Sequence, residues 1–247
     1  SQLDPAPKSA ALAAAKALDA VLQNQAAGVE LRLAVSGCGL EGVQLCRPIA
    51  ERFVELDLSF NSLKTDALAA LAPNSLRSIV LAGNLLTSVP RFTGEMPKLV
   101  KLDLSFNDIG KLPDEDVMQR LSSLRSIGLQ NCMLKSVLNS KGKFALAQLA
   151  NLSALDLSFN LLPEPSELQH ITCLQRLQEI DVGCNEMCAS EAYNEALASL
   201  RRKMSTLKKV NDEAVRREFG GYGADAIAAQ ISAIADALSK DNSSCSC

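Results

Sequence analysis

The chain has 247 residues, of which 47% are hydrophobic and only 4% aromatic, so we expect a core filled by aliphatic side chains. Its formal net charge of -3 argues against a nucleic-acid-binding protein, which needs an excess of Lys and Arg. No run of about 18 apolar residues predicts a membrane span, and the charged first 25 residues do not fit a signal peptide. We therefore expect a soluble protein in the cytoplasm.

The first predicted element is an Ala-rich helix, "KSAALAAAKALDAVLQN" (8–24). Its apolar face is suited to packing on the first structural unit after residue 28. We expect residues 1–28 to form an N-terminal cap.

A repeated pattern occupies the middle of the chain. The hexapeptide LDLSFN occurs at 56–61, 102–107 and 155–160, and seven segments share its wider spacing, L-x-x-L-x-L-x-x-N/C-x-L. These segments are 30–40, 53–63, 76–86, 99–109, 124–134, 152–162 and 177–187. Seven matches in register are a specific signal. In each, the two leucines of "LxL" point to one face of a short strand, which only stacking on neighbouring strands can bury.

This pattern resembles the leucine-rich repeat family. The resemblance implies an α/β solenoid: a right-handed, curved horseshoe with a parallel sheet on its concave side and mixed helical and irregular structure on its convex side. We expect repeats over 29–189, with helical turns in 64–75 and 113–123 and a loop leading into a short helix in 138–150. The Asn or Cys at the ninth position should donate to backbone carbonyls and form a ladder along the stack.

A second cap is predicted over 190–219. "SEAYNEALASLRRKM" (190–204) has one apolar stripe and Ser190 as its expected N-cap, and "TLKKVNDEAV" (206–215) supplies a closing strand. The region resembles the C-terminal cap of intracellular leucine-rich repeat proteins such as phosphatase-1 regulators and axonemal dynein light chains. Glu186-Met187 and Asn211 depart from the usual Pro-Leu and Asp. The resemblance implies a cytoskeletal, ciliary or flagellar (axonemal) setting.

Residues 220–247 begin with a glycine-rich hinge and continue as an amphipathic helix, which packs either on the cap or on a partner. The terminal Cys245-Ser-Cys247 resembles the doubly prenylated ends of Rab-type GTPases, so lipidation is an alternative to a flexible tail. We expect contact with a membrane only if these cysteines carry lipids.

The residues between the strand leucines predict a binding surface on the concave face. Aspartate and phenylalanine recur there in alternate repeats, which suits a basic or mixed-charge protein segment. The expected partner-binding residues are Asp57, Phe60, Asp103, Phe106, Asp156, Phe159 and Asp181. In the alternative interpretation, the motif is common to the family and the rings pack on their neighbours.

The C-terminal cap carries a basic patch made of Arg201, Arg202, Lys203, Lys208 and Lys209. This patch is either a solvated helix face or a second surface for an acidic partner.

Enzyme chemistry finds little support. The single histidine, His170, has no nucleophile at a recognisable spacing, and Cys184 and Cys188 lack the second ligand pair of a zinc site. We therefore expect a non-enzymatic scaffold or adaptor that binds proteins, with no metal, cofactor, nucleic acid or small-molecule substrate. The alternatives are a regulatory subunit of a protein phosphatase and a lipid-anchored adaptor.

Overall fold

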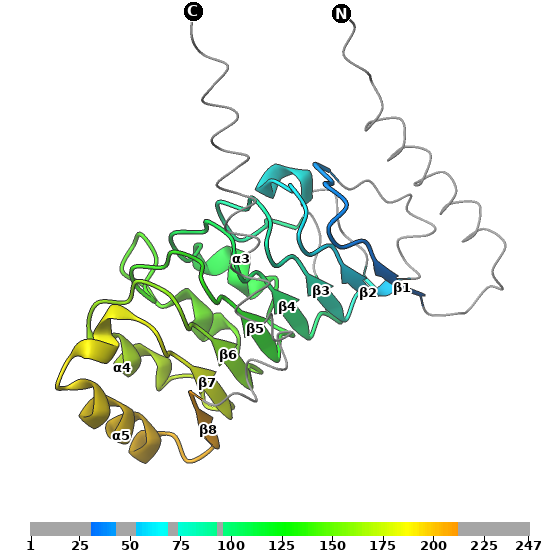
Figure 1. The fold of residues 1–247 in the computed structure, drawn as a ribbon. Helices are drawn as coiled ribbons and strands as arrows, with labels where there is room; N and C mark the ends of the chain where they lie inside the picture. Colours follow the sequence, from blue (N-terminus) through cyan, green and yellow to red (C-terminus); the bar gives the residue numbers. More distant parts are fainter. Residues whose placement is uncertain (1–30, 43–52, 69–73, 93–95, 212–247) are drawn as a thin grey trace, which may run out of the picture.

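The computed structural model describes residues 31–42, 53–68, 74–92 and 96–211. In these ranges the chain forms an open, eight-stranded parallel sheet in which the strands follow one another in sequence order (Figure 1). The strands are β1 (Leu31–Ala34), β2 (Phe53–Asp57), β3 (Ser78–Val80), β4 (Lys101–Asp103), β5 (Ser126–Gly128), β6 (Ala154–Asp156), β7 (Glu179–Asp181) and β8 (Lys209–Val210). The predicted solenoid of stacked coils is confirmed.

Short helices form the other side of the coils. They are η1 (Thr65–Leu68), α3 (Glu115–Gln119), η2 (Ala145–Gln148), η3 (Pro165–Glu167), α4 (Leu168–Ile171), η4 (Glu186–Ala189) and α5 (Tyr193–Lys203). Figure 1 shows α3 and α4 behind the sheet and α5 at the end that carries β8. Helical turns therefore lie where the periodicity of 64–75, 113–123 and 138–150 predicted them. Within the described ranges no helix is long and apolar enough to cross a membrane.

The core lies between the sheet and the helical layer. Each of the six strands β2–β7 contributes one central aliphatic residue at the same register, and these side chains are at most 1% exposed. They are Leu56, Ile79, Leu102, Ile127, Leu155 and Ile180. Because every coil presents the same row, the buried surface runs continuously along the stack, which a single repeat could not achieve.

The predicted asparagine ladder is confirmed in detail. The Asn107 Nδ2 atom donates to the carbonyls of Leu104 (2.8 Å) in its own coil and Leu81 (3.0 Å) in the preceding coil. Its Oδ1 atom accepts from the Leu86 N–H at 3.0 Å. The same pattern recurs at Asn61, Asn84, Asn160 and Asn185. Each amide therefore satisfies backbone groups of two coils at once.

The two cysteines of the ladder behave differently. Cys132 is buried and its thiol donates to the Leu104 carbonyl at 3.3 Å, whereas Cys38 is exposed. A thiol thus replaces the donor half of the amide at Cys132, but it supplies no oxygen acceptor.

The C-terminal cap consists of α5 and β8. The helix begins at Tyr193 with Ala192 as its N-cap, so the prediction of Ser190 as N-cap was wrong. The Ser190 Oγ atom instead accepts from the Ala192 N–H at 3.3 Å, in the turn before the helix. Asn211 then joins the cap to the last repeat, since its Oδ1 accepts from the Val182 N–H (2.9 Å) and its Nδ2 donates to Tyr193 Oη (2.8 Å). The predicted helix 8–24, the hinge and helix of 220–240 and the terminal cysteines lie outside the described residues.

Candidate interaction surface on the sheet

Four aspartates occupy one column of the sheet, on the face away from the core. Parallel pairing places Asp57 beside Val80, Val80 beside Asp103, Asp103 beside Gly128, Gly128 beside Asp156, and Asp156 beside Asp181. The structure thus brings together residues spread over more than a hundred positions of sequence, as the repeat register predicted.

The carboxylates are less exposed than the sequence pattern suggests. Asp103, Asp156 and Asp181 are 1%, 0% and 0% exposed, and Asp57 is half-buried. Their role in binding a partner stays a prediction, but the surface differs from an open acidic strip. Three of its four carboxylates are buried beneath the molecular surface.

Each aspartate also has a structural task that the sequence analysis missed. Its Oδ1 atom accepts the backbone N–H two residues later, at 2.9 Å in Asp57 and Asp156 and 3.0 Å in Asp103. Asp181 does the same with the Gly183 N–H at 2.9 Å. This contact fixes the chain where it leaves the strand. The D-x-S/G spacing of the repeats is the signal that could have revealed it.

Burial shifts the titration of the central aspartates. It raises the pKa of Asp156 to about 6, against the hydrogen bonds from Ser158, and repulsion by Asp181 and Asp103 acts in the same direction as burial. Burial likewise raises the pKa of Asp103, and Ser105 opposes the shift. Ionising Asp103 and Asp156, in the middle of this face, is therefore less favourable than ionising an exposed aspartate.

The phenylalanines lie in a strained column. Phe60, Phe106 and Phe159 have φ values of 56°, 59° and 56°, in the left-handed region that disfavours residues with a Cβ atom. The other repeats place Gly37, Gly83, Asn131 and Cys184 in the same conformation. The glycines in this column were the sequence signal for it. Phe159 is 44% exposed.

The basic patch of the cap is partly neutralised. Arg202 pairs with Glu195 at 2.7 Å, and Lys209 pairs with Glu179 at 2.8 Å. The Lys208 ammonium donates to the Gln178 side chain at 2.9 Å, while Arg201 and Lys203 are exposed. Binding of an acidic partner by this patch stays a prediction.

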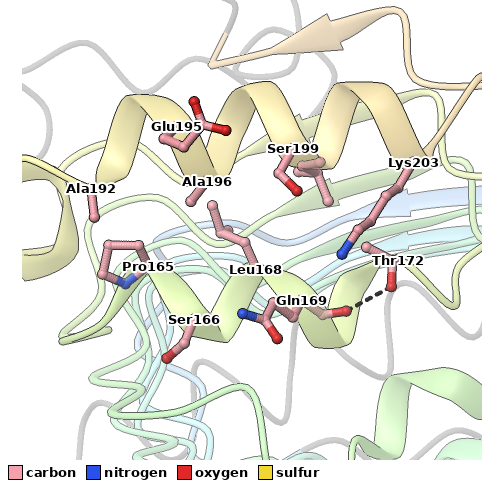
Figure 2. Close-up of a pocket in the computed structure, with 11 residues that line it drawn as sticks. Pro165, Ser166, Leu168, Gln169, Thr172, Ala192, Glu195, Ala196, Ser199 and Lys203 are labelled. Atoms are coloured by element: carbon pink, nitrogen blue, oxygen red, sulfur yellow. Dashed lines mark hydrogen bonds between the residues drawn. The ribbon is translucent and has the colours of Figure 1, made fainter.

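A separate cleft of about 320 Å³ lies between α4 and α5, on the helical side of the last coils. Figure 2 shows Leu168 and Ala196 facing each other across it, with the Lys203 side chain reaching toward Thr172. The Thr172 hydroxyl donates to the Gln169 carbonyl at 2.7 Å (Figure 2). No charged pair converges in this cleft among the side chains that line it, so it offers packing surface rather than a reactive centre.

The residues considered for catalysis or metal binding do not converge. His170 is exposed in α4, with its ring centroid 6.4 Å from that of Phe144. Across the described ranges no three His, Cys, Asp or Glu side chains are grouped so as to hold a metal ion. Cys38, Cys132, Cys173, Cys184 and Cys188 are free thiols.

Comparison with known proteins supports the repeat assignment. Residues 74–134 match the leucine rich repeat family model. Chaoptin from Drosophila melanogaster is 32% identical over 154 residues, which cover 61% of this chain and 11% of Chaoptin. The monocyte differentiation antigen CD14 from Oryctolagus cuniculus is 34% identical over 96 residues, covering 37% of this chain and 25% of that protein. The chain therefore matches only a small part of the length of these curated relatives.

Two solved structures from Listeria monocytogenes are also similar. Internalin InlF aligns with 18% identity and a TM-score of 0.48, covering 79% of this chain and 67% of that one. Internalin C2 aligns with 24% identity and a TM-score of 0.42, covering 62% and 61%. The local family match, the open parallel sheet and the asparagine ladder agree: the chain has the fold of a leucine-rich repeat solenoid.

Proposed function

We propose that the protein is a non-enzymatic scaffold or adaptor that binds another protein through the concave sheet face. Leucine-rich repeat proteins generally mediate protein–protein interaction, and solenoids offer extended concave surfaces for it. The observation that carries the proposal is the alignment of Asp57, Asp103, Asp156 and Asp181 in one column, with the Phe residues beside it.

The chemistry of this face selects a basic or mixed-charge partner segment. The carboxylates supply long-range attraction and register, and aromatic side chains supply contact area. Phe159 at 44% exposure is the most accessible ring. A phenylalanine in this left-handed conformation, which favours glycine or asparagine, costs about 1 kcal/mol per residue. Backbone preference therefore does not explain the three rings, and contact with a partner protein would.

Affinity capture from the source cell tests the proposal. The native full chain is compared with a variant in which Phe60, Phe106 and Phe159 are replaced by Asn, a residue that the structure already carries in this conformation at Asn131. A matched control replaces Leu85 and Met133, which are 43% and 48% exposed and lie outside the strands, by Asn. Loss of a protein from the first variant alone supports concave binding; equal capture by all three refutes it.

The C-terminal cap suggests the setting. Helix α5 is followed by β8, which pairs with β7 at the end of the sheet, and this order supports the resemblance to intracellular leucine-rich repeat proteins. We propose a cytoplasmic assembly of cytoskeletal, ciliary or axonemal type. Inhibition assays on a panel of protein phosphatases separate this from the regulatory-subunit alternative. The intact mass of the native protein decides whether Cys245 and Cys247 carry lipids, because prenyl groups add a defined mass.

A further inference from the structure

The two rims of the sheet differ in charge. All strands are parallel, so they begin at one rim and end at the other. The five residues that end with the first residue of each strand β3–β8 contain seven cations and one carboxylate. The cations are Arg77, Lys98, Lys101, Arg125, Arg176, Lys208 and Lys209, and the carboxylate is Glu179. The turns on the other rim, at 60–62, 83–85, 106–108, 131–133, 159–161 and 184–186, contain no Lys or Arg. We call the basic rim the entry rim.

Cations on the strands interact with carboxylates of the sheet, whereas most cations just before the strands do not. Lys209 pairs with Glu179 at 2.8 Å, and the charge of Lys101 acts on Asp103. Four cations outside the strands are exposed, and within the described part of the chain none of them forms an ion pair. These four are Lys98, Arg125, Arg176 and Lys208. Their charge is therefore available to a partner.

Two of these cations are held in place by neutral groups. The Arg176 Nη1 atom donates to the Asn151 Oδ1 atom at 2.6 Å, and the Lys208 Nζ atom donates to the Gln178 Oε1 atom at 2.9 Å. An amide oxygen orients a cation without cancelling its charge. Because arginine has five N–H donors and lysine has three, both side chains keep most of their donors for other contacts.

The backbone places the rim residues in register. The Arg125 N–H donates to the Val100 carbonyl at 2.8 Å, and the Arg125 carbonyl accepts from the Ser153 N–H at 2.8 Å. The Gln178 N–H then donates to Ser153, and the Lys208 N–H to Gln178, at 2.8 and 2.7 Å. These five residues therefore form one column along the stack, with one residue from each coil.

The cations are grouped in two pairs. Lys98 and Arg125 precede the adjacent strands β4 and β5, and Arg176 and Lys208 precede the adjacent strands β7 and β8. Residues 150–154, which lead to β6, carry no charge. With a strand spacing of about 4.8 Å, the centres of the two pairs are about 14 Å apart. An extended chain advances about 3.4 Å per residue, so this distance corresponds to about four residues.

We propose that the entry rim binds an extended acidic segment of a partner protein, in which two pairs of acidic residues are separated by two uncharged residues. The pattern acid-acid-x-x-acid-acid repeats the spacing of the cation pairs. Val100, which is 37% exposed and next to Arg125 in the column, adds apolar contact. Single-stranded nucleic acid fits less well, because the chain has a net charge of -3 and the five-residue segments before β3–β8 contain no aromatic side chain for base stacking.

This surface goes beyond the proposed function, because it is separate from the Asp and Phe columns of the sheet face. It is also distinct from the basic patch on the cap, with which it shares only Lys208. Arg125 and Arg176 belong to neither of those surfaces, so they are the residues whose replacement tests the entry rim alone.

Selection from a peptide library tests the inference. The full chain is immobilised and exposed to phage that display random twelve-residue peptides, and the retained peptides are sequenced. We expect enrichment of two acidic pairs at the stated spacing. Fluorescence anisotropy then measures the dissociation constant of one enriched peptide. Replacing its acidic residues by their amides should raise this constant at least about tenfold, as expected for the loss of several exposed ion pairs.

A charge reversal and a matched control locate the binding. Arg125→Glu with Arg176→Glu should raise the dissociation constant at least about tenfold. Lys111→Glu with Lys135→Glu changes the net charge equally at exposed positions away from the entry rim, and should change the constant less than about twofold. Equal weakening by both variants would mean a general charge effect and would overturn the inference. Circular dichroism checks folding, and Arg125→Gln with Arg176→Gln replaces the reversal if that variant does not fold.

Other outcomes separate this inference from the proposed function. The variant with Phe60, Phe106 and Phe159 replaced by Asn should bind the acidic peptide as the native chain does, whether or not it loses a captured partner. A library that yields no acidic pattern would overturn the entry rim and leave binding by the sheet face untouched. The assignment to a protein segment also fails if a twelve-nucleotide single-stranded RNA, or vesicles that contain phosphatidylserine, bind more tightly than the peptide and displace it.

Discussion

Replacing Asp156 by Asn is expected to stabilise the free protein at neutral pH. The Asp156 Oδ1 atom accepts two hydrogen bonds from Ser158, and an asparagine oxygen can accept both. The second oxygen has no hydrogen-bond partner, so replacing it by an amide group breaks no hydrogen bond. The change therefore removes one buried charge from a 0% exposed side chain and leaves the local turn in place.

The magnitude follows from the pKa shift. The pKa of Asp156 rises from 3.8 to about 6 because of burial. A shift of about two units corresponds to about 3 kcal/mol of opposition to folding at pH 7.5. Because the pKa is higher in the folded than in the unfolded state, this opposition is complete above pH 6 and fades as the pH falls toward 4. The amide introduces its own unpaired N–H groups, so we expect a net gain of about 1–3 kcal/mol at pH 7.5.

Urea unfolding at pH 7.5, 6.0 and 4.5 measures this effect. The difference between Asp156→Asn and the native protein should shrink steadily toward pH 4.5. Asp57→Asn serves as the control, since Asp57 occupies the same motif position but is only half-buried. A loss of more than about 1 kcal/mol for Asp156→Asn at pH 7.5 would refute the reasoning, because it would mean that the free protein already pairs this charge.

Three further predictions concern the repeat itself. Asn107→Ala leaves three backbone carbonyls and one N–H without their side-chain partner, and should lower the free energy of unfolding by at least about 3 kcal/mol in urea titrations; an effect below 1 kcal/mol would contradict the ladder. Phe159→Asn relieves the left-handed strain that Asn131 tolerates, so its unfolding midpoint should stay equal or rise while partner capture falls; a clear loss of stability would make the ring a packing residue instead. Iodoacetamide should modify the exposed Cys173 and leave Cys132 unmodified until urea unfolds the protein, because burial suppresses thiolate formation; peptide mass spectrometry reads both sites, and early labelling of Cys132 would count against its burial.

Much of the fold was accessible from sequence because the signal is repeated. The L-x-L pairs predicted strands such as Leu102 and Leu155 in register, and the ninth-position Asn predicted a polar ladder. Hydrophobic period and side-chain donors are local properties, so a single repeat already contains them. The same locality explains why the N-cap of α5 was placed at Ser190: serine is a common N-cap residue, but it lies two positions before the observed N-cap, Ala192.

The features of the site that were missed depend on neighbouring coils. Nothing within "LDLSFN" reveals that Asp156 is buried, because its surroundings come from Gly128 and Asp181 in other repeats. The side-chain amide of Asn160 likewise bonds to a different coil through both its atoms: Nδ2 donates to the Leu129 carbonyl, and Oδ1 accepts from the Leu134 N–H. Aligning columns across repeats could have found the left-handed column, since Gly37 and Gly83 stand where others have Phe.

The amide ladder has a direction. The Oδ1 atom of each asparagine accepts from the turn of the coil before it, as Asn160 does with the N–H groups of Cys132 and Leu134 (2.9 and 3.0 Å). Each turn is thus locked by the coil that follows it, and Asn211 locks the last one. Between Asn61 and Asn211 in the described chain, Cys132 is the one rung without such an oxygen, and it lies four residues after the end of β5. Mechanical strain along the stack should therefore concentrate at this rung, so that bending occurs between the fourth and fifth coils.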